Sequence, residues 1–206
     1  MKPLPRSFYL CPTLQVARDL LGKHIIRKID DKLLIGKIVE VEAYCKGDPA
    51  SHAFRGRTKR NDVMFWEGGH LYVYFTYGMH FCANVVTGNE GIGEAVLIRA
   101  VEPLAGIEMM KINRYGSNKS LNPKSLNRKS LINLSNGPAK FCQAFGIARK
   151  ENGVDLIGGE IIITDGEPVP SKLIKCSSRI GIQQGMEKKW RFFIAGNSWV
   201  SKLDKT

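Results

Sequence analysis

The predicted fold is organised by residues 33–44, LLIGKIVEVEAY, which have the composition of one long β-strand. Side chains of a strand alternate between its two faces, so Glu40, Glu42 and Tyr44 share one face. The intervening valines and alanine take the other face. Two carboxylates and an aromatic ring therefore meet on one face, where they form either a chemical site or the solvated acidic face of an edge strand.

Other segments are also predicted to be strands, because they are rich in β-branched or aromatic residues. They are Leu71–Tyr77, Phe81–Val86, Ala95–Val101, Glu160–Thr164 and Arg191–Ala195. Most of them are separated by Gly, Pro, Asn or Asp, which are the residues that favour turns.

Two segments have helical patterns. In the first, we expect Thr13 to cap a short helix whose apolar residues recur every 3.6 positions until Gly22 ends it. The second is Pro138–Phe145, with proline in its first turn and Gly146 at its end. Because strands and helices do not alternate regularly, the sequence predicts an α+β fold, a single mixed domain with a largely antiparallel sheet.

Length and charge bound the function. The chain has 206 residues, 43% of them hydrophobic, which suits one core and a single domain over residues 1–206. Its net charge of +12, from 31 basic and 19 acidic residues, favours nucleic acid as a partner over anionic lipid or acidic protein. Ser117–Ser135 repeats Lys-Ser-Leu among polar residues, so we expect a mobile basic surface loop at 117–135.

The cysteines and histidines do not indicate a metal site. The five cysteines are widely spaced with no Cys-x-x-Cys pair, and the four histidines form no His-Glu-x-x-His motif. We therefore expect reduced thiols, no metal and no cofactor. The chain has no sustained apolar N-terminal region and no stretch approaching the roughly 20 apolar residues of a membrane span. We expect a cytoplasmic protein with no membrane partner.

A basic segment runs from His52 to Asn61 and has the composition of a phosphate-contacting loop. Such contacts supply affinity and orientation without reading base sequence. The candidate phosphate contacts are Arg55, Arg57, Lys59 and Arg60. A solvated charge run would have the same composition, and His52 would then be an ordinary structural histidine.

Residues 71–84, LYVYFTYGMHFCAN, are predicted to form two strands joined by a tight turn at Gly78. Tyr77 would lie at the tip, where a large ring serves as a wedge between stacked bases. Tyr74 points away from the face of its apolar neighbours and would form one wall of an aromatic pocket. The alternative is that both rings pack against the sheet.

Arg99 interrupts residues 96–101, VLIRAV, which otherwise have the composition of a buried strand. A buried guanidinium requires a carboxylate or water as partner. Glu42 is an attractive candidate, because the arginine would then hold in place both a general base and its water. A structural ion pair with Glu40 or Glu102 is the alternative.

Taken together, these motifs closely resemble the alkyladenine (3-methyladenine) DNA glycosylase family in its small single-domain form. Each motif is short, but their order and spacing along almost the whole chain make the set specific. The matching stretches are VEAY at 41–44, LYVY at 71–74, YGM at 77–79, FC at 81–82, LIRA at 97–100, EPL at 102–104, GPAK at 137–140, RIG at 179–181, RFF at 191–193 and SWV at 198–200.

The resemblance implies a DNA-repair enzyme with a curved sheet and a protruding β-hairpin that inserts into DNA. Glu42 would be the general base that activates water, and Arg99 would help to position Glu42. Tyr77 would replace the flipped nucleotide in the duplex, with Met79 beside it in the groove.

The resemblance also implies which residues enclose the flipped base. These are Tyr44, His52, Tyr74 and Asn84, of which Asn84 would disfavour guanine by crowding its 2-amino group. His80 stands where better-known members carry an aromatic residue, so contacts with DNA are expected to differ there.

The implied substrates are 3-methyladenine, 7-methylguanine, hypoxanthine and ethenoadenine in double-stranded DNA. They would be released without strand cleavage by a monomer that needs no obligate protein partner. Two other readings remain open. A lysine nucleophile would release the base through a Schiff base and cleave the strand, whereas an architectural or RNA-binding protein would stack bases without cleavage.

Overall fold

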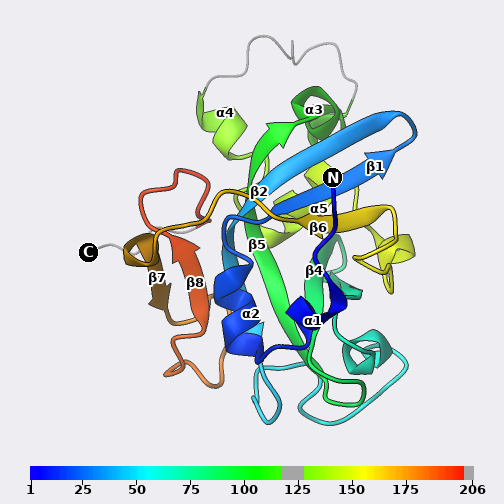
Figure 1. The fold of residues 1–206 in the computed structure, drawn as a ribbon, viewed down its shortest axis with the longest axis vertical. Helices are drawn as coiled ribbons and strands as arrows, with labels where there is room; N and C mark the ends of the chain where they lie inside the picture. Colours follow the sequence, from blue (N-terminus) through cyan, green and yellow to red (C-terminus); the bar gives the residue numbers. More distant parts are fainter. Residues whose placement is uncertain (117–127, 202–206) are drawn as a thin grey trace.

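The computed structural model describes residues 1–116 and 128–201, and its described strands join one antiparallel sheet. The main path is β3-β4-β5-β2-β1-β6, and β8, which also pairs with β7, joins it through β2 (Figure 1). This confirms the predicted mixed α+β fold with a curved antiparallel sheet. The strands are β1 His24–Ile29, β2 Lys32–Tyr44, β3 Leu71–Thr76, β4 His80–Thr87, β5 Glu94–Ala105, β6 Ile161–Thr164, β7 Ile174–Ser177 and β8 Arg191–Ile194.

Strand β2 lies at the centre of the sheet. One of its edges pairs with β5 along most of its length, and the two strands run side by side through the molecule in Figure 1. The other edge pairs first with β1, over residues 32–37, and then with β8, over residues 40–42. Residues 38–43 are buried, so the edge-strand alternative is wrong. Both the apolar and the acidic face of β2 are covered.

The sequence did not predict β1 and β7. In β1, HIIRKI, and in β7, IKCS, basic residues interrupt short apolar runs, which weakens the strand pattern. Pairing with neighbouring strands stabilises both segments as strands. β1 lies between β2 and β6, and β7 pairs with β8.

One predicted helix is confirmed, whereas the predicted cap of another helix is wrong. The predicted helix at Pro138–Phe145 is confirmed, and Gly146 ends it in the left-handed region at φ 67°. The predicted cap is wrong: Thr13 is already helical, and its hydroxyl bonds to Thr87 and Glu94 instead. The described helices are α1 Arg6–Tyr9, α2 Thr13–Asp19, α3 Ile107–Tyr115, α4 Arg128–Ile132 and α5 Pro138–Phe145, with the 3-10 helices η1 Asp62–Phe65, η3 Arg149–Glu151 and η4 Ser171–Leu173.

Most of the predicted basic loop at 117–135 lies outside the described residues. Its described end differs from a loop, because residues 128–132 form α4. Leu134 is buried in the core, and the Ser135 hydroxyl donates to the carbonyl oxygen of Val101. These contacts with β5 tie the end of the segment to the sheet.

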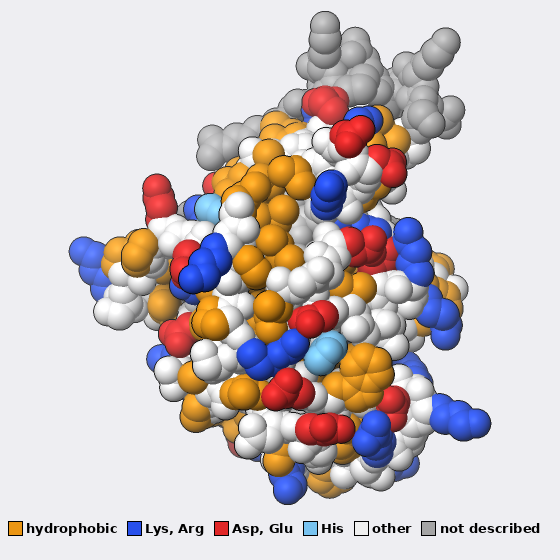
Figure 2. Space-filling view, turned by 45° about the vertical axis from the view of Figure 1, so that its right-hand side comes forward, with side chains coloured by type: hydrophobic (Ala, Val, Ile, Leu, Met, Phe, Trp, Pro, Cys, Tyr) orange, Lys and Arg blue, Asp and Glu red, His pale blue; other side chains and the backbone are white. Residues whose placement is uncertain are grey.

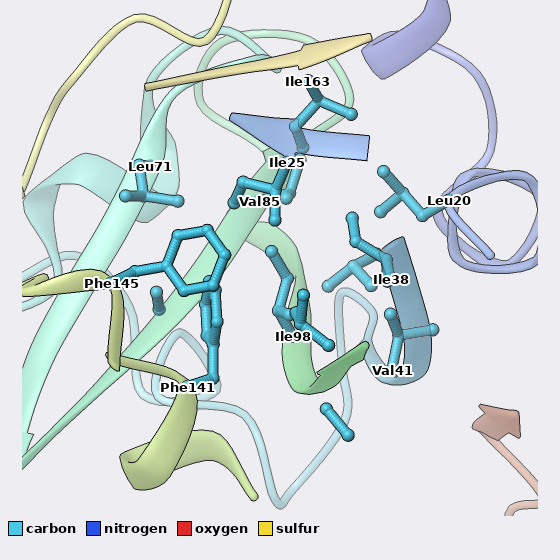
Figure 3. Packing of buried hydrophobic residues seen from close by; sticks show 14 of the residues in the cluster. Leu20, Ile25, Ile38, Val41, Leu71, Val85, Ile98, Phe141, Phe145 and Ile163 are labelled. Carbon is cyan, nitrogen blue, oxygen red and sulfur yellow. The ribbon is translucent and has the colours of Figure 1, made fainter. Parts of the chain in front are cut away.

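The main core lies between the sheet and the helices. In Figure 3, Phe141 and Phe145 of α5 lie beside Ile98 of β5, and Leu20 lies toward Ile38 on the other side of the view. All five side chains are fully buried. This packing fixes α5 against β4 and β5 and so holds the strands that carry the site.

One glycine permits this packing. A Cβ atom at Gly36 would lie 2.2 Å from Cγ1 of Val101 and 3.0 Å from Cζ of Phe145. Any larger residue would therefore push β2 away from β5 or displace α5.

Charge is mixed on the face drawn in Figure 2, where acidic and basic side chains are interspersed around a band of hydrophobic residues. The net charge of +12 is therefore not expressed as a uniform positive field over the part of the surface drawn there. Among the described residues, no helix combines the length and the apolar character needed to cross a membrane.

We expect Phe141→Ala to lower the free energy of unfolding by about 3–5 kcal/mol, because it deletes a buried ring and leaves a cavity. Phe54→Ala is the control, since that ring is 51% exposed; its cost should be about 1 kcal/mol or less. Urea titrations followed by circular dichroism measure both variants. Equal losses would contradict the assignment of Phe141 to the core.

Candidate active site

One cavity gathers side chains from segments that are distant in sequence. Its volume is about 360 Å³, and it lies at the C-terminal end of β2, beside the β3–β4 hairpin and the loop at 180–182. The residues predicted for the site that line it are Glu42, Tyr44, His52, Tyr74, Tyr77, Asn84 and Arg99. Met79 and the four basic loop residues do not line it.

The Glu42 carboxylate lies in this cavity with no solvent exposure of its own. Its Oε1 atom accepts a hydrogen bond from the amide of Ile180 at 2.7 Å, and its Oε2 atom accepts one from the Tyr44 hydroxyl at 3.0 Å. Burial and the adjacent Glu42 charge raise the pKa of Tyr44 well above its ordinary range, so Tyr44 stays a neutral donor.

A β-bulge aims Arg99 at the same face. Glu40 pairs with Ala100 while Val41 pairs with Ile98, so Arg99 is the extra residue in β5. Bulges re-aim a side chain that would otherwise follow the strand alternation. The guanidinium of Arg99 thereby reaches the acidic face of β2.

Arg99 bridges the two carboxylates. Its Nε lies 2.8 Å from Glu40 and its Nη1 lies 3.1 Å from Glu42. Two of the three partners proposed from sequence, Glu42 and Glu40, are thus present, whereas the third, Glu102, pairs with Lys37 at 2.7 Å. Burial alone would lower the pKa of Arg99, but the charges of Glu42 and Glu40 raise it.

Glu40 is saturated by structural partners. Besides Arg99, its Oε1 atom accepts hydrogen bonds from Nε of Arg191 at 2.8 Å and from the Ser201 hydroxyl at 2.7 Å. The Ser201 amide donates to Oε2. Glu40 therefore holds the C-terminal segment and β8 against β2, which leaves Glu42 as the carboxylate that faces the cavity.

Aromatic rings form another wall. The ring of His52 lies edge-on to Tyr74 with centroids 4.4 Å apart, and its Nδ1 lies 3.1 Å from the Tyr72 hydroxyl. Tyr72 and Tyr74 are tilted by 30° at 5.6 Å. Burial raises the pKa of Tyr72 to about 12, so its phenol is neutral at physiological pH. A small cluster of Val63, Met64, Val86 and Ala95 supports these rings from behind.

Two asparagines organise the polar part of the site. Asn84 is buried in the lining, and its Nδ2 donates to the carbonyl of Tyr72 at 3.1 Å. Asn61, which the sequence did not single out, donates to the carbonyls of His52 at 2.8 Å and Gly56 at 3.0 Å. It also accepts from the amide of Thr58 at 2.6 Å. Asn61 thus shapes the loop that carries His52.

The β3–β4 hairpin closes through residues 77–79, and Thr76 pairs with His80 across them. Tyr77 has φ 51° and Gly78 has φ 67°, and the amide of Met79 donates to the carbonyl of Thr76 at 3.3 Å. Two successive left-handed residues define a type I′ turn, which strongly prefers Asn-Gly. Tyr77 is 84% exposed and Met79 is 67% exposed, so neither ring nor thioether folds back onto the sheet.

The basic loop faces solvent. Arg55, Arg57, Lys59 and Arg60 are all exposed. The Arg57 side chain pairs with Asp62 at 2.6 Å, and Arg60 donates to the carbonyl of Phe75 in the hairpin at 3.3 Å. These positions leave the cationic groups accessible to an anion, as a phosphate contact requires.

The cavity offers no set of ligands for a metal among the described residues, where no three His, Cys, Asp or Glu side chains cluster. The polar side chains of its lining are one carboxylate, one guanidinium, phenols, an amide, an imidazole, a threonine hydroxyl and a thiol. Such a set can position and activate water beside an aromatic base.

Comparison with known proteins identifies the family of the chain. A family model described as methylpurine-DNA glycosylase matches residues 7–198, which include every residue of the cavity. The chain belongs to the methylpurine-DNA glycosylase family. The resemblance seen in the sequence motifs is thus confirmed over nearly the entire chain.

Relatives agree over their full length. A protein of Carboxydothermus hydrogenoformans is 52% identical over 200 residues, covering 97% of this chain and 98% of its own. Proteins of Clostridium acetobutylicum and Methanoculleus marisnigri are 44% and 42% identical, and each match covers at least 97% of both chains. All three are provisionally named 3-methyladenine DNA glycosylases.

Sequence reasoning missed some residues of the site. Ile180 donates to Glu42, and its motif, RIG at 179–181, was part of the resemblance without a role assigned to it. Asp48, which bonds to Arg179, had no signal, because the sequence pattern of a loop does not reveal its partner. The cavity lining also includes Tyr72, Cys82 and Leu97, which belong to motifs that carried the resemblance. The signal for these three was therefore present.

We expect His52 to titrate below the ordinary histidine range, because burial and the charge of Arg60 lower its pKa. Arg60→Ala should raise the midpoint, since loss of a nearby positive charge favours imidazolium. Arg55→Ala, a neighbouring exposed arginine, is the control and should have a smaller effect. NMR titration measures these midpoints, and an unchanged value in Arg60→Ala would contradict the electrostatic part of the explanation.

Proposed function

We propose that this protein is a monofunctional DNA glycosylase that flips damaged purines out of duplex DNA and hydrolyses the base–sugar bond with water activated by Glu42. The observation that carries the proposal is a buried, hydrogen-bonded carboxylate in an aromatic cavity next to an exposed tyrosine hairpin. Family membership and the names of the relatives support the same activity.

Extrusion of the nucleotide comes first. A base inside a duplex is out of reach of catalytic groups, and extruding it costs a few kcal/mol. Tyr77, projecting from the hairpin, would fill the vacated space and slow the return of the base. Met79 would lie beside it in the groove, and Arg55, Arg57, Lys59 and Arg60 would contact phosphates. These contacts fix the position of the protein on DNA without reading sequence.

Hydrolysis would follow in the cavity. A carboxylate has about four acceptor positions. Glu42 accepts hydrogen bonds from Ile180 and Tyr44 and forms an ion pair with Arg99. An open position on Oε2 would hold the water molecule. Glu42 would take a proton from this water as its oxygen bonds to C1′ of the sugar, and the base would leave with the electron pair of the N-glycosidic bond. The negative charge of Glu42 also stabilises the positive charge that develops on the sugar.

The cavity suits one purine. Its volume of about 360 Å³ lies at the small end of ligand sites. Stacking on Tyr44, His52 and Tyr74 contributes about 1–3 kcal/mol per base and tolerates different bases. Cationic 3-methyladenine and 7-methylguanine gain cation–π attraction and are good leaving groups. Hypoxanthine and ethenoadenine would be accepted by the same surfaces, and Asn84 would crowd the 2-amino group of guanine.

Two observations disfavour the other readings. Among the described residues that line the cavity there is no lysine, so a Schiff-base nucleophile has no candidate there. An architectural protein would have no use for a buried carboxylate held by two hydrogen bonds and an ion pair. Because one flipped nucleotide needs one cavity, we expect a monomer without an obligate protein partner.

We expect Glu42→Gln to bind a hypoxanthine or N7-methylguanine duplex but to release the base about 10²- to 10⁴-fold more slowly, because the amide cannot accept the proton. Single-turnover base release without added metal measures this against the wild type. Equal rates would remove Glu42 from the mechanism, and binding without release by either protein would favour the architectural reading. A covalent adduct trapped by borohydride would show a lysine nucleophile instead.

We expect Tyr77→Asn to keep or raise the thermal unfolding midpoint, because asparagine suits the left-handed position of the turn. Base release from duplex DNA should fall about tenfold or more, since the wedge is lost while the extrusion cost remains. Release from a single-stranded oligonucleotide carrying the same lesion is the control and should change less. Equal losses on the two substrates would contradict the wedge role.

A further inference from the structure

A second buried ion pair lies next to the cavity and has no place in the mechanism above. The side chains of Arg179 and Asp48 are fully buried. Both terminal nitrogens of Arg179 donate to the Asp48 carboxylate, with 2.9 Å between Nη2 and Oδ1. The guanidinium lies 4.7 Å over the ring of Tyr44 and 5.3 Å over that of Trp190. Arg179 is thus held by a planar fork on one partner and by two ring faces.

The pair joins two walls of the cavity. Asp48 belongs to the loop that leads from β2 to His52, and Arg179 directly precedes the segment 180–182, which lines the cavity. Neither segment has regular secondary structure, so no ladder of backbone hydrogen bonds fixes it. Nη1 of Arg179 also donates to the carbonyl of Ala43 at 3.0 Å, next in sequence to Glu42. The ion pair therefore connects both loops to the end of β2.

This connection bears on the catalytic carboxylate. The amide of Ile180, adjacent to Arg179, donates to Oε1 of Glu42 at 2.7 Å. Tyr44, on which Arg179 stacks, donates to Oε2 at 3.0 Å. Both hydrogen-bond donors to Glu42 thus lie in or next to residues that Arg179 contacts.

The chain closes tightly over the pair. Gly185 has φ 63°, and a Cβ atom there would lie 3.1 Å from both Nη2 of Arg179 and Oδ1 of Asp48. Lys188 adds a second cation 3.5 Å from Asp48. Burial alone would raise the pKa of Asp48, but the hydrogen bond and charge of Arg179 lower it. The pair therefore stays ionic at neutral pH.

We propose that Arg179, clamped by Asp48, is a positioning residue for base release that holds the Ile180 amide and the Tyr44 ring on Glu42. The inference rests on the proposed role of Glu42 as the base. If the clamp is loosened, the carboxylate loses a backbone donor, which makes it easier to protonate. It also loses its fixed orientation toward the attacking water.

Arg179→Lys tests the proposal, because lysine keeps the positive charge beside Asp48 but lacks the planar fork that reaches Ala43 and stacks on Tyr44. We expect the single-turnover rate of base release to fall about 100-fold, as for a small misplacement of a catalytic group. The dissociation constant for the lesion duplex should change less than about threefold, because misplacing a catalytic group slows the chemical step more than it weakens binding. The acid side of the pH–rate profile should move to higher pH.

Arg27→Lys is the matched control. Arg27 forms an equally buried pair with Glu151, and neither residue lines the cavity. We expect a similar loss of thermal stability from this variant, with the rate and the pH profile unchanged. The double variant Asp48→Asn with Arg179→Gln removes both charges at once and so avoids leaving an unpaired buried charge. Circular dichroism checks its fold, and its rate should fall as in Arg179→Lys.

Wild-type rates in Arg179→Lys and in the folded double variant would overturn the proposal. A fall without the pH shift, or one matched by Arg27→Lys, would show a purely structural pair and overturn it equally. Glu42→Gln is assayed in parallel to separate the two hypotheses. Wild-type release by Glu42→Gln would defeat the proposed function itself, whereas loss in Glu42→Gln with normal release in both clamp variants would defeat only the inference on Arg179.

Discussion

Two carboxylates buried on one face of a central strand are the constraint on which the rest of this structure depends. Glu40 and Glu42 have no solvent exposure, and burying a charge without a partner costs several kcal/mol. The fold supplies partners from three directions. A bulge in β5 delivers Arg99, the pairing of β8 with β2 delivers Arg191, and an irregular loop delivers the amide of Ile180. Much of the topology around β2 can be understood as neutralising this face.

The two carboxylates have different surroundings. Glu40 is saturated by arginines and by Ser201, so it contributes to holding β8 and the C-terminal segment in place. Arg99 contacts both carboxylates and therefore links Glu42 to the buried ion pairs and hydrogen bonds around Glu40. Of the two, only Glu42 lines the cavity. The role proposed for it, accepting a proton in a fixed direction, would benefit from neighbours that hold it in place.

The tip of the β3–β4 hairpin is exposed, in contrast to the buried carboxylates. Tyr77 occupies a left-handed backbone position that a bulky residue rarely adopts, and its ring is almost entirely in solvent. Local strain and an exposed ring reduce stability, and such features concentrate at functional sites. The aromatic rings of His52 and Tyr74 line the same cavity as this exposed tip. The exposed tip and the aromatic cavity are thus adjacent on one sheet, as the proposed roles of wedge and base pocket require.

The sequence by itself determined the long strand β2, five more strands, helix α5 and the antiparallel class, because side-chain alternation and turn residues act locally. Through the motif resemblance it also identified Glu42 and the aromatic residues of the cavity. Tertiary structure alone decided that β2 is central, that Thr13 bonds to Thr87 instead of capping a helix, and that Arg99 bridges two carboxylates. It also joined Arg179 to Asp48 across 131 positions. Periodicity indicates which face a residue takes, but the partner that covers this face depends on how distant segments pack.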